Sequence, residues 1–232
     1  MCKASPELHV VADSRCTPRS FRAAGSPAGT FPHQPWWHCT FHDPYERVNV
    51  WSHGVPGLLF LVLGLLSSFG WGDGSKTLAV FSVCAACTHL LSAITHIFPD
   101  SHQLEKCDHL GIVALIIGTP VTALMAKEHG DVPVDLVVVT LVMLAAAFLP
   151  PLLRVLGFGV GIAAIVLLHG RTIVNLNLAG QLLLYFLGGV GFVRNSGHLR
   201  WTGFSDHHFL HYTVTAACCL HVHYILAAMR VA

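Results

Sequence analysis

The sequence contains few charged residues for its length. Only 11% of its 232 residues are Asp, Glu, Lys or Arg, and 53% are hydrophobic, whereas a soluble domain carries about 25% charged residues. The formal net charge is +1, so no excess of positive charge favours nucleic-acid binding. With a mean hydropathy of +0.61, the composition indicates an integral membrane protein.

Two further features are missing. The chain has no Asn-x-Ser/Thr glycosylation acceptor, and its first residues (MCKASPELHVVADSRC) contain no apolar segment. We therefore expect no cleavable signal peptide, and the first span should act as its own targeting signal. The 8 cysteines are scattered. Cys84 and Cys87 form a CxxC within an apolar run, where small residues favour helix packing over metal or redox chemistry.

Apolar runs separated by short polar breaks extend from about residue 51 to the C-terminus. A helix needs about 20 residues to cross a bilayer. The fold class predicted is therefore all-α, a seven-transmembrane helical bundle, with spans at 54–72, 77–98, 109–127, 133–149, 152–169, 173–193 and 206–229. The fourth and fifth spans are separated only by Pro150-Pro151. Residues 1–45 are rich in Pro, Ser, Gly, Arg and His. They predict a disordered N-terminal tail before a membrane domain at 46–232.

Seven spans with short loops would bring several ionisable residues to one membrane face. His96 lies near the end of the second span, Asp108 at the start of the third, and His207 and His211 at the start of the seventh. The ends of even-numbered spans and the starts of odd-numbered spans share the side of the N-terminus. Because ionisable residues within a membrane are costly and usually functional, the cluster indicates a site.

Helical spacing narrows this cluster to a metal site. His207 and His211 are four residues apart and share a helix face, as do Ser92 and His96. Three histidines with one open coordination position are typical of catalytic zinc. Asp108 either orients a ligand or holds a metal-bound water; otherwise it is a carboxylate favoured by the start of a helix.

The remaining polar residues in the spans have simpler explanations. Most are expected to be packing or interhelical hydrogen-bonding residues: His89, His169, His221, His223, Asn175, Asn177 and Gln181. A haem protein or ion transporter is an alternative. Histidines four apart on one helix cannot be the two opposite axial ligands of a haem, so a haem would need a pair such as His89 with His221.

Four segments, in order along the chain, resemble motifs of the progestin and adipoQ receptor family, within the wider hemolysin III-like group of seven-span proteins. They are Glu46–His53 (ERVNVWSH), Ser92–His96 (SAITH), Cys107–Ile112 (CDHLGI) and Asp206–His211 (DHHFLH). The resemblance covers residues 42 to 224. A weaker match ends at Leu167-Leu168-His169-Gly170, and His221 matches a later family histidine.

The resemblance implies a zinc ion near the cytoplasmic side of the bundle, held by His96, His207 and His211, with Asp108 bonding through a zinc-bound water and Ser92 nearby. It implies either a receptor for adiponectin-like or steroid ligands, or a regulator of zinc and lipid homeostasis, with structural zinc. Some relatives hydrolyse ceramide, and the fold is similar to alkaline ceramidases. In a hydrolase, Asp108 would accept a proton and Ser92 would donate a hydrogen bond to the oxyanion.

The sequence departs from the family pattern in the loop at 194–200, at Asp206 (usually Ser) and at His208 (usually Gln). These changes put loop-dependent activity and ligand choice in question. Arg and Lys number nine on the N-terminal side and four on the other, but five against four without the distant tail. The expectation of a cytoplasmic N-terminus and site, in the plasma membrane or an endomembrane, therefore rests on the resemblance. Expected partners are the lipid bilayer, a lipid or small extracellular ligand, and further copies of the chain.

Overall fold

The computed structural model describes residues 35–70, 73–128, 133–173, 175–194 and 205–229. These residues form helices only, which confirms the all-α prediction. In chain order, the helices are α1 (Trp36–Phe41), α2 (Glu46–Ser68), α3 (Asp73–Ile97), α4 (His102–Glu128), α5 (Val134–Ala146), α6 (Pro151–Ile173), α7 (Leu176–Arg194) and α8 (Asp206–Met229).

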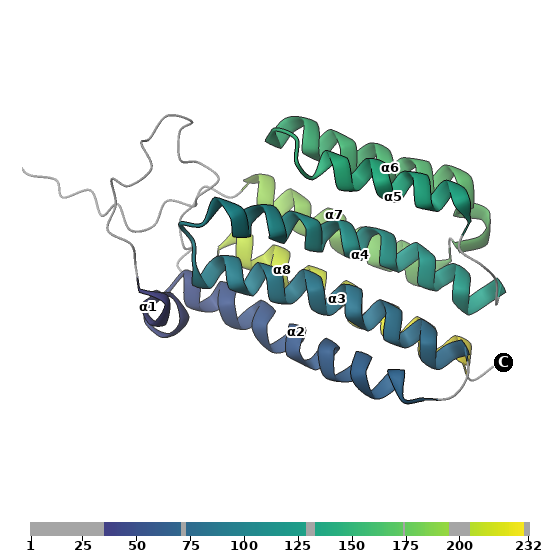
Figure 1. Ribbon diagram of the computed structural model, residues 1–232, viewed down its shortest axis with the longest axis horizontal. Helices are drawn as coiled ribbons and strands as arrows, with labels where there is room; N and C mark the ends of the chain where they lie inside the picture. Colours follow the sequence, from purple (N-terminus) through teal and green to yellow (C-terminus); the bar gives the residue numbers. More distant parts are fainter. Residues whose placement is uncertain (1–34, 71–72, 129–132, 174, 195–204, 230–232) are drawn as a thin grey trace, which may run out of the picture.

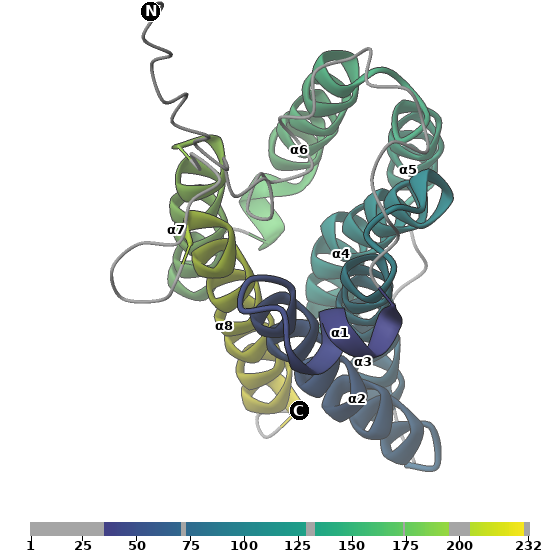
Figure 2. The same ribbon diagram turned by 90° about the vertical axis from the view of Figure 1, so that its left-hand side faces the viewer.

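The long helices lie side by side with roughly aligned axes (Figure 1). Viewed from the end that carries α1, α8 packs between α7 and the pair α2 and α3, and α4 continues the row towards α5 and α6 (Figure 2). A hydrophobic cluster that includes Phe60 of α2, Phe81 of α3 and Cys218 of α8 joins these three helices. A second cluster, including Leu124, Leu136 and Ile165, joins α4, α5 and α6.

Five described helices are long and apolar enough to cross a membrane: α2, α3, α4, α6 and α8. The apolar helices Val134–Ala146 and Leu176–Phe192 are shorter. At 1.5 Å per residue the 13-residue α5 is roughly 20 Å long, against a hydrocarbon core of about 30 Å. The length and apolar composition of the helices therefore indicate an integral membrane protein, while the count of seven spans stays a prediction.

Several helices extend beyond the apolar runs from which they were predicted. Helix α2 begins at Glu46 instead of residue 54, and α4 begins at His102 instead of residue 109. The carboxylate of Asp43 accepts hydrogen bonds from the backbone N–H groups of Tyr45 and Glu46, both at 2.8 Å. This carboxylate satisfies two N–H groups at the start of α2, which allows a polar first turn that hydropathy cannot detect.

The helix α1, at 36–41, falls within the stretch predicted as a tail, while residues 1–34 lie outside the described residues. It carries aromatic side chains outward: Trp36 and Trp37 are both about half exposed. Because Trp is enriched at the membrane–water interface, α1 is suited to lie at that boundary. Its Cys39 is buried, and desolvation together with the carboxylates of Glu46 and Asp43 raises the pKa of this thiol to about 11.

Helices α3 and α4 lie close together where Gly111 of α4 meets Thr88 of α3. The Thr88 hydroxyl donates a hydrogen bond of 2.7 Å to the carbonyl oxygen of Gly111. A Cβ atom on Gly111 would lie only 3.0 Å from the Cα of Thr88. Small residues at such contacts are the usual means of close helix packing in membranes.

We expect Gly111→Ala to destabilise the protein by about 1–3 kcal/mol, because backbone atoms must move to admit the methyl group. Gly159→Ala is the matched control, since no atom outside its own helix backbone lies within 4 Å of its Cβ position and alanine favours helices by about 1 kcal/mol. Thermal unfolding in detergent measures both variants. Equal Tm values for Gly111→Ala and wild type would contradict the tight contact.

Candidate metal centre

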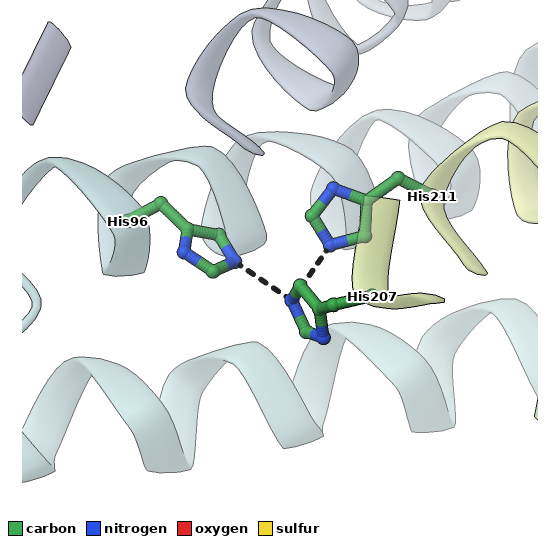
Figure 3. A group of neighbouring side chains, drawn as sticks. All are labelled: His96, His207 and His211. Carbon is green, nitrogen blue, oxygen red and sulfur yellow. Dashed lines mark hydrogen bonds between the residues drawn. The ribbon is translucent and has the colours of Figure 1, made fainter. Parts of the chain in front are cut away.

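Three histidines from two helices meet at the end of the bundle that carries α1. His96 lies in the last turn of α3, and His207 and His211 lie in the first two turns of α8. Their side chains point toward one another (Figure 3). The Nε2 atoms of His96 and His207 are 3.3 Å apart, and those of His207 and His211 are 3.0 Å apart. The predicted trio is therefore brought together by the fold.

This spacing fits a transition-metal ion. All three residues offer a ligand atom within 4.8 Å of the others, and they are the group of this kind found among the described residues. Two nitrogens bound at about 2.0–2.1 Å to a tetrahedral ion are about 3.3–3.4 Å apart. Imidazoles suit zinc, copper, iron and nickel, so the geometry supports a metal site without fixing the metal.

The hydrogen bond from His96 to α2 fixes which ring nitrogen is free to bind a metal. The Nδ1 atom of His96 lies 2.7 Å from Oε2 of Glu46. An ionised carboxylate only accepts hydrogen bonds, so Nδ1 carries the proton and donates it to this contact. In the neutral imidazole the lone pair is then on Nε2, which faces His207.

His211 also forms a hydrogen bond to α2 through its Nδ1 atom. Its Nδ1 lies 3.0 Å from the hydroxyl oxygen of Ser52, and that hydroxyl donates a hydrogen bond of 3.1 Å to the carbonyl oxygen of Asn49. When the hydroxyl proton of Ser52 is directed to Asn49, the oxygen accepts from the Nδ1–H of His211, and the lone pair of His211 is then also on Nε2.

His207 lies between the other two histidines. Its Nε2 faces both of their Nε2 atoms, but a neutral imidazole carries only one ring proton. If that proton is on Nε2, it can be directed to only one lone pair; if it is on Nδ1, three lone pairs converge. Either tautomer leaves at least one lone pair in the cluster without a proton to accept, and a bound cation would stabilise it.

Asp108 and Ser92 lie beside His96. Ser92 is one helical turn before His96 and is buried, with 6% of its surface exposed. The Asp108 carboxyl group is within hydrogen-bonding reach of the Ser92 hydroxyl and interacts electrostatically with His96. Asp108 lies two turns inside α4 instead of at its start, which removes the explanation of a carboxylate at a helix N-terminus. Their catalytic roles remain predictions.

His208 has a different role from its two neighbours on α8. Its Nδ1 accepts a hydrogen bond of 3.0 Å from the backbone N–H of Ser205, and its Nε2 lies 3.1 Å from the carbonyl oxygen of Tyr45. The Ser205 hydroxyl in turn accepts from the backbone N–H of His208 at 3.1 Å, as an N-cap does. His208 thus links the start of α8 to the start of α2.

Two other buried histidines have partners within the bundle. His89 bonds the carbonyl of Ala85 at 2.8 Å and lies 3.1 Å from the Thr215 hydroxyl. His221 lies between Thr122 and Gln181, at 2.8 and 3.1 Å. The contact with Ala85 lies within α3, and the contacts with Thr215, Thr122 and Gln181 are interhelical hydrogen bonds. The loop at 194–200 differs from the family pattern, and its residues 195–200 lie outside the described part of the chain.

Sequence reasoning missed the contribution of α2. Glu46, Asn49, Ser52 and His53 entered only as letters of a motif, yet the first turns of α2 supply hydrogen-bond partners to two of the three clustered histidines. A signal was available in the sequence. These four polar residues are spaced three, three and one apart just before the first predicted span, and in a helix that continued from the span they would lie on one face. Hydropathy had placed these residues before the span.

The described helices and the histidine cluster define a multi-span α-helical membrane protein with a candidate metal centre at one end. A family model described as haemolysin-III related matches residues 41–222. The chain belongs to this family, and the resemblance drawn from its four motifs is confirmed. A search of curated proteins gave no match.

We expect the double variant His207→Ala/His211→Ala to lose its bound metal, because a single imidazole would remain. Metal analysis of purified protein measures this directly, with about one ion per chain expected in wild type. His208→Gln and His223→Ala should retain the ion, since His208 is held by backbone groups and His223 is exposed. Unchanged metal content in the double variant would refute the ligand assignment.

Proposed function

We propose that the protein is a zinc-dependent membrane hydrolase that cleaves lipid amides of the ceramide type. The observation that carries this proposal is the juxtaposition of three facing imidazole nitrogens with a carboxyl group and a hydroxyl. Asp108 and Ser92 add a proton acceptor and a hydrogen-bond donor to a set of ligands that leaves a coordination position open.

Amide hydrolysis breaks the C–N bond, adds water across it and releases a fatty acid and an amine. Zinc, when bound, supplies a Lewis acid that polarises the amide carbonyl and makes water more acidic. Asp108 would accept the proton of the attacking water and return it to the departing nitrogen. Ser92 would donate its hydroxyl hydrogen to the oxygen on which negative charge develops.

The depth of the site suits such a substrate. The clustered histidines belong to the last turn of α3 and the first turns of α8, and α1 with its exposed tryptophans lies at the same end (Figure 1). The site would thus lie near the membrane–water boundary. The amide of a ceramide-like lipid lies between its polar head and its hydrocarbon tails, at a similar depth.

We place the site and the N-terminus on the cytoplasmic side, in the plasma membrane or an endomembrane, and this placement rests on the family resemblance. The described Arg and Lys residues near the span ends provide no clear bias: Arg47, Lys106, Arg154 and Arg194 are at the site end, and Lys76, Lys127 and Arg171 at the other.

Purified protein in lipid nanodiscs should hydrolyse a fluorescent ceramide, and a zinc chelator should abolish the turnover. Asp108→Asn should lower kcat by at least about 100-fold, because general-base catalysis contributes about 10²–10⁴-fold, while zinc content stays unchanged. Ser92→Ala should lower kcat by a smaller factor. Turnover that is equal with and without chelator, or absent under every condition, would exclude the hydrolase.

A second candidate is a receptor or lipid and zinc regulator in which the metal is structural. The favouring observation is that the histidine cluster joins α3 to α8 and, through the Ser52–His211 and Glu46–His96 hydrogen bonds, both of them to α2. A metal there would hold three helices together at one end of the bundle.

In this second case, His96→Ala should lower the Tm in detergent by several degrees and abolish ligand-dependent signalling, without any hydrolysis in wild type. The Tm difference should disappear when both proteins are measured in excess chelator. A His96→Ala variant that has lost its metal but keeps wild-type stability and signalling would contradict a structural role.

A further inference from the structure

We infer that the first two turns of α2 are a positioning shell for the metal centre, in which Glu46 sets the orientation of His96 and Ser52 sets that of His211. This inference rests on the proposed metal binding and deepens it. Neither residue touches the point where the Nε2 atoms converge. Each instead acts through the far side of a ligand ring, by accepting the Nδ1 proton.

The shell is built from one rigid element. Glu46 and Ser52 lie on α2 with Asn49 between them. Asn49 is fully buried and donates from Nδ2 to Oε2 of Glu46 at 3.2 Å, while its carbonyl accepts from Ser52 at 3.1 Å. One buried side chain and its own backbone therefore align both partners of the histidines.

The partners on α2 also act on the orientation of the imidazole rings. A metal-bound histidine usually donates its other N–H to a carboxylate, a carbonyl or another oxygen, which fixes the tautomer and the ring orientation. Two of the three clustered histidines meet this condition within the described residues. His53, which follows Ser52, packs edge-on against the ring of His211 with centroids 3.9 Å apart, and this contact restricts the rotation of that ring.

Positioning of the ligands and simple helix pairing give different expectations for variants of α2. If Glu46 and Ser52 only tied α2 to its neighbours, removing them would reduce stability but leave the affinity and coordination of a bound ion intact. If Glu46 instead held a protonated His96 as an ion pair, the imidazolium would compete with the metal, and removal of the carboxylate would tighten metal binding. Positioning predicts the opposite change.

The experiment measures metal binding by the full chain in detergent, after removal of metal by chelation. Zn²⁺ affinity is obtained by competition with a chelating dye, and the Co²⁺ absorption spectrum reports the coordination geometry. Glu46→Ala and Ser52→Ala should each bind Zn²⁺ about 10- to 100-fold more weakly than wild type, with a shifted Co²⁺ spectrum. Glu46→Gln should lose less, because its amide oxygen still accepts from His96.

Two variants serve as controls for serine. Ser52→Thr keeps the hydroxyl and should restore both Zn²⁺ affinity and the Co²⁺ spectrum. Ser68→Ala, at the other end of α2, removes a hydroxyl that donates to the carbonyl of Gly64 at 2.8 Å, and should leave both readouts unchanged. If Glu46→Ala does not fold, the comparison of Ser52→Ala with Ser68→Ala decides.

The possible results separate this inference from the proposed function. Wild-type affinity and spectrum in Ser52→Ala and Glu46→Ala, or tighter Zn²⁺ binding in Glu46→Ala, would overturn the positioning shell and leave the hydrolase standing. Weaker binding in both variants together with a wild-type protein that hydrolyses no ceramide would support the shell and overturn the hydrolase. A wild-type protein that binds no Zn²⁺ or Co²⁺ would overturn both.

Discussion

The hydrocarbon of a bilayer offers no hydrogen-bond partner, so polar side chains within a span are stabilised by partners inside the protein. Several of the contacts between helices in this protein meet that constraint. Thr88 of α3 bonds the backbone of α4, and His221 of α8 reaches Thr122 and Gln181 on two further helices. These hydrogen bonds fix how the helices are rotated, because a polar residue turned toward lipid would lose its partner.

The histidine cluster meets the need for internal hydrogen-bond partners in a different way. His96 and His211 each give their Nδ1 proton to α2, and the pairing that satisfies those nitrogens leaves the opposite lone pairs facing a common point. Protein groups alone cannot satisfy three facing nitrogens with the protons available to neutral rings. A cation resolves the conflict, and it also contributes to the folding energy of any state that binds it. The arrangement is therefore consistent with a site that is built for a metal.

Much of this arrangement could be predicted from the sequence. The alternation of spans and the four-residue spacing of His207 and His211 were enough to bring His96 to the same end of the bundle. What could not be predicted was the part that begins outside the apolar runs. Hydropathy measures the preference for lipid over water, but the first turns of α2 and α4 are polar and become helical through capping and tertiary contacts. Glu46 was therefore assigned to the region before the span, and its contact with His96 was not anticipated.

The number of spans illustrates a related limit. The apolar runs predict seven, but α5 and the apolar part of α7 are shorter than the other long helices. Short helices can be accommodated by a locally thinner bilayer or by flanking residues that reach the interface. Length and composition describe each helix alone, whereas crossing depends on the bilayer and on the neighbouring helices. For this reason the helical fold follows from the sequence more securely than the count.

The first two turns of α8 show how a family motif can change while the proposed metal ligands stay in place. His207 and His211 face α3, whereas His208, a quarter-turn away, faces the start of α2. The family motif that this segment resembles usually has glutamine at this last position. His208 accepts from one backbone group through Nδ1 and can donate to another through Nε2, and a glutamine amide offers one acceptor and one donor group as well. The exchange of glutamine for histidine therefore conserves the hydrogen-bonding role of this position. It does not change the face of α8 that carries His207 and His211.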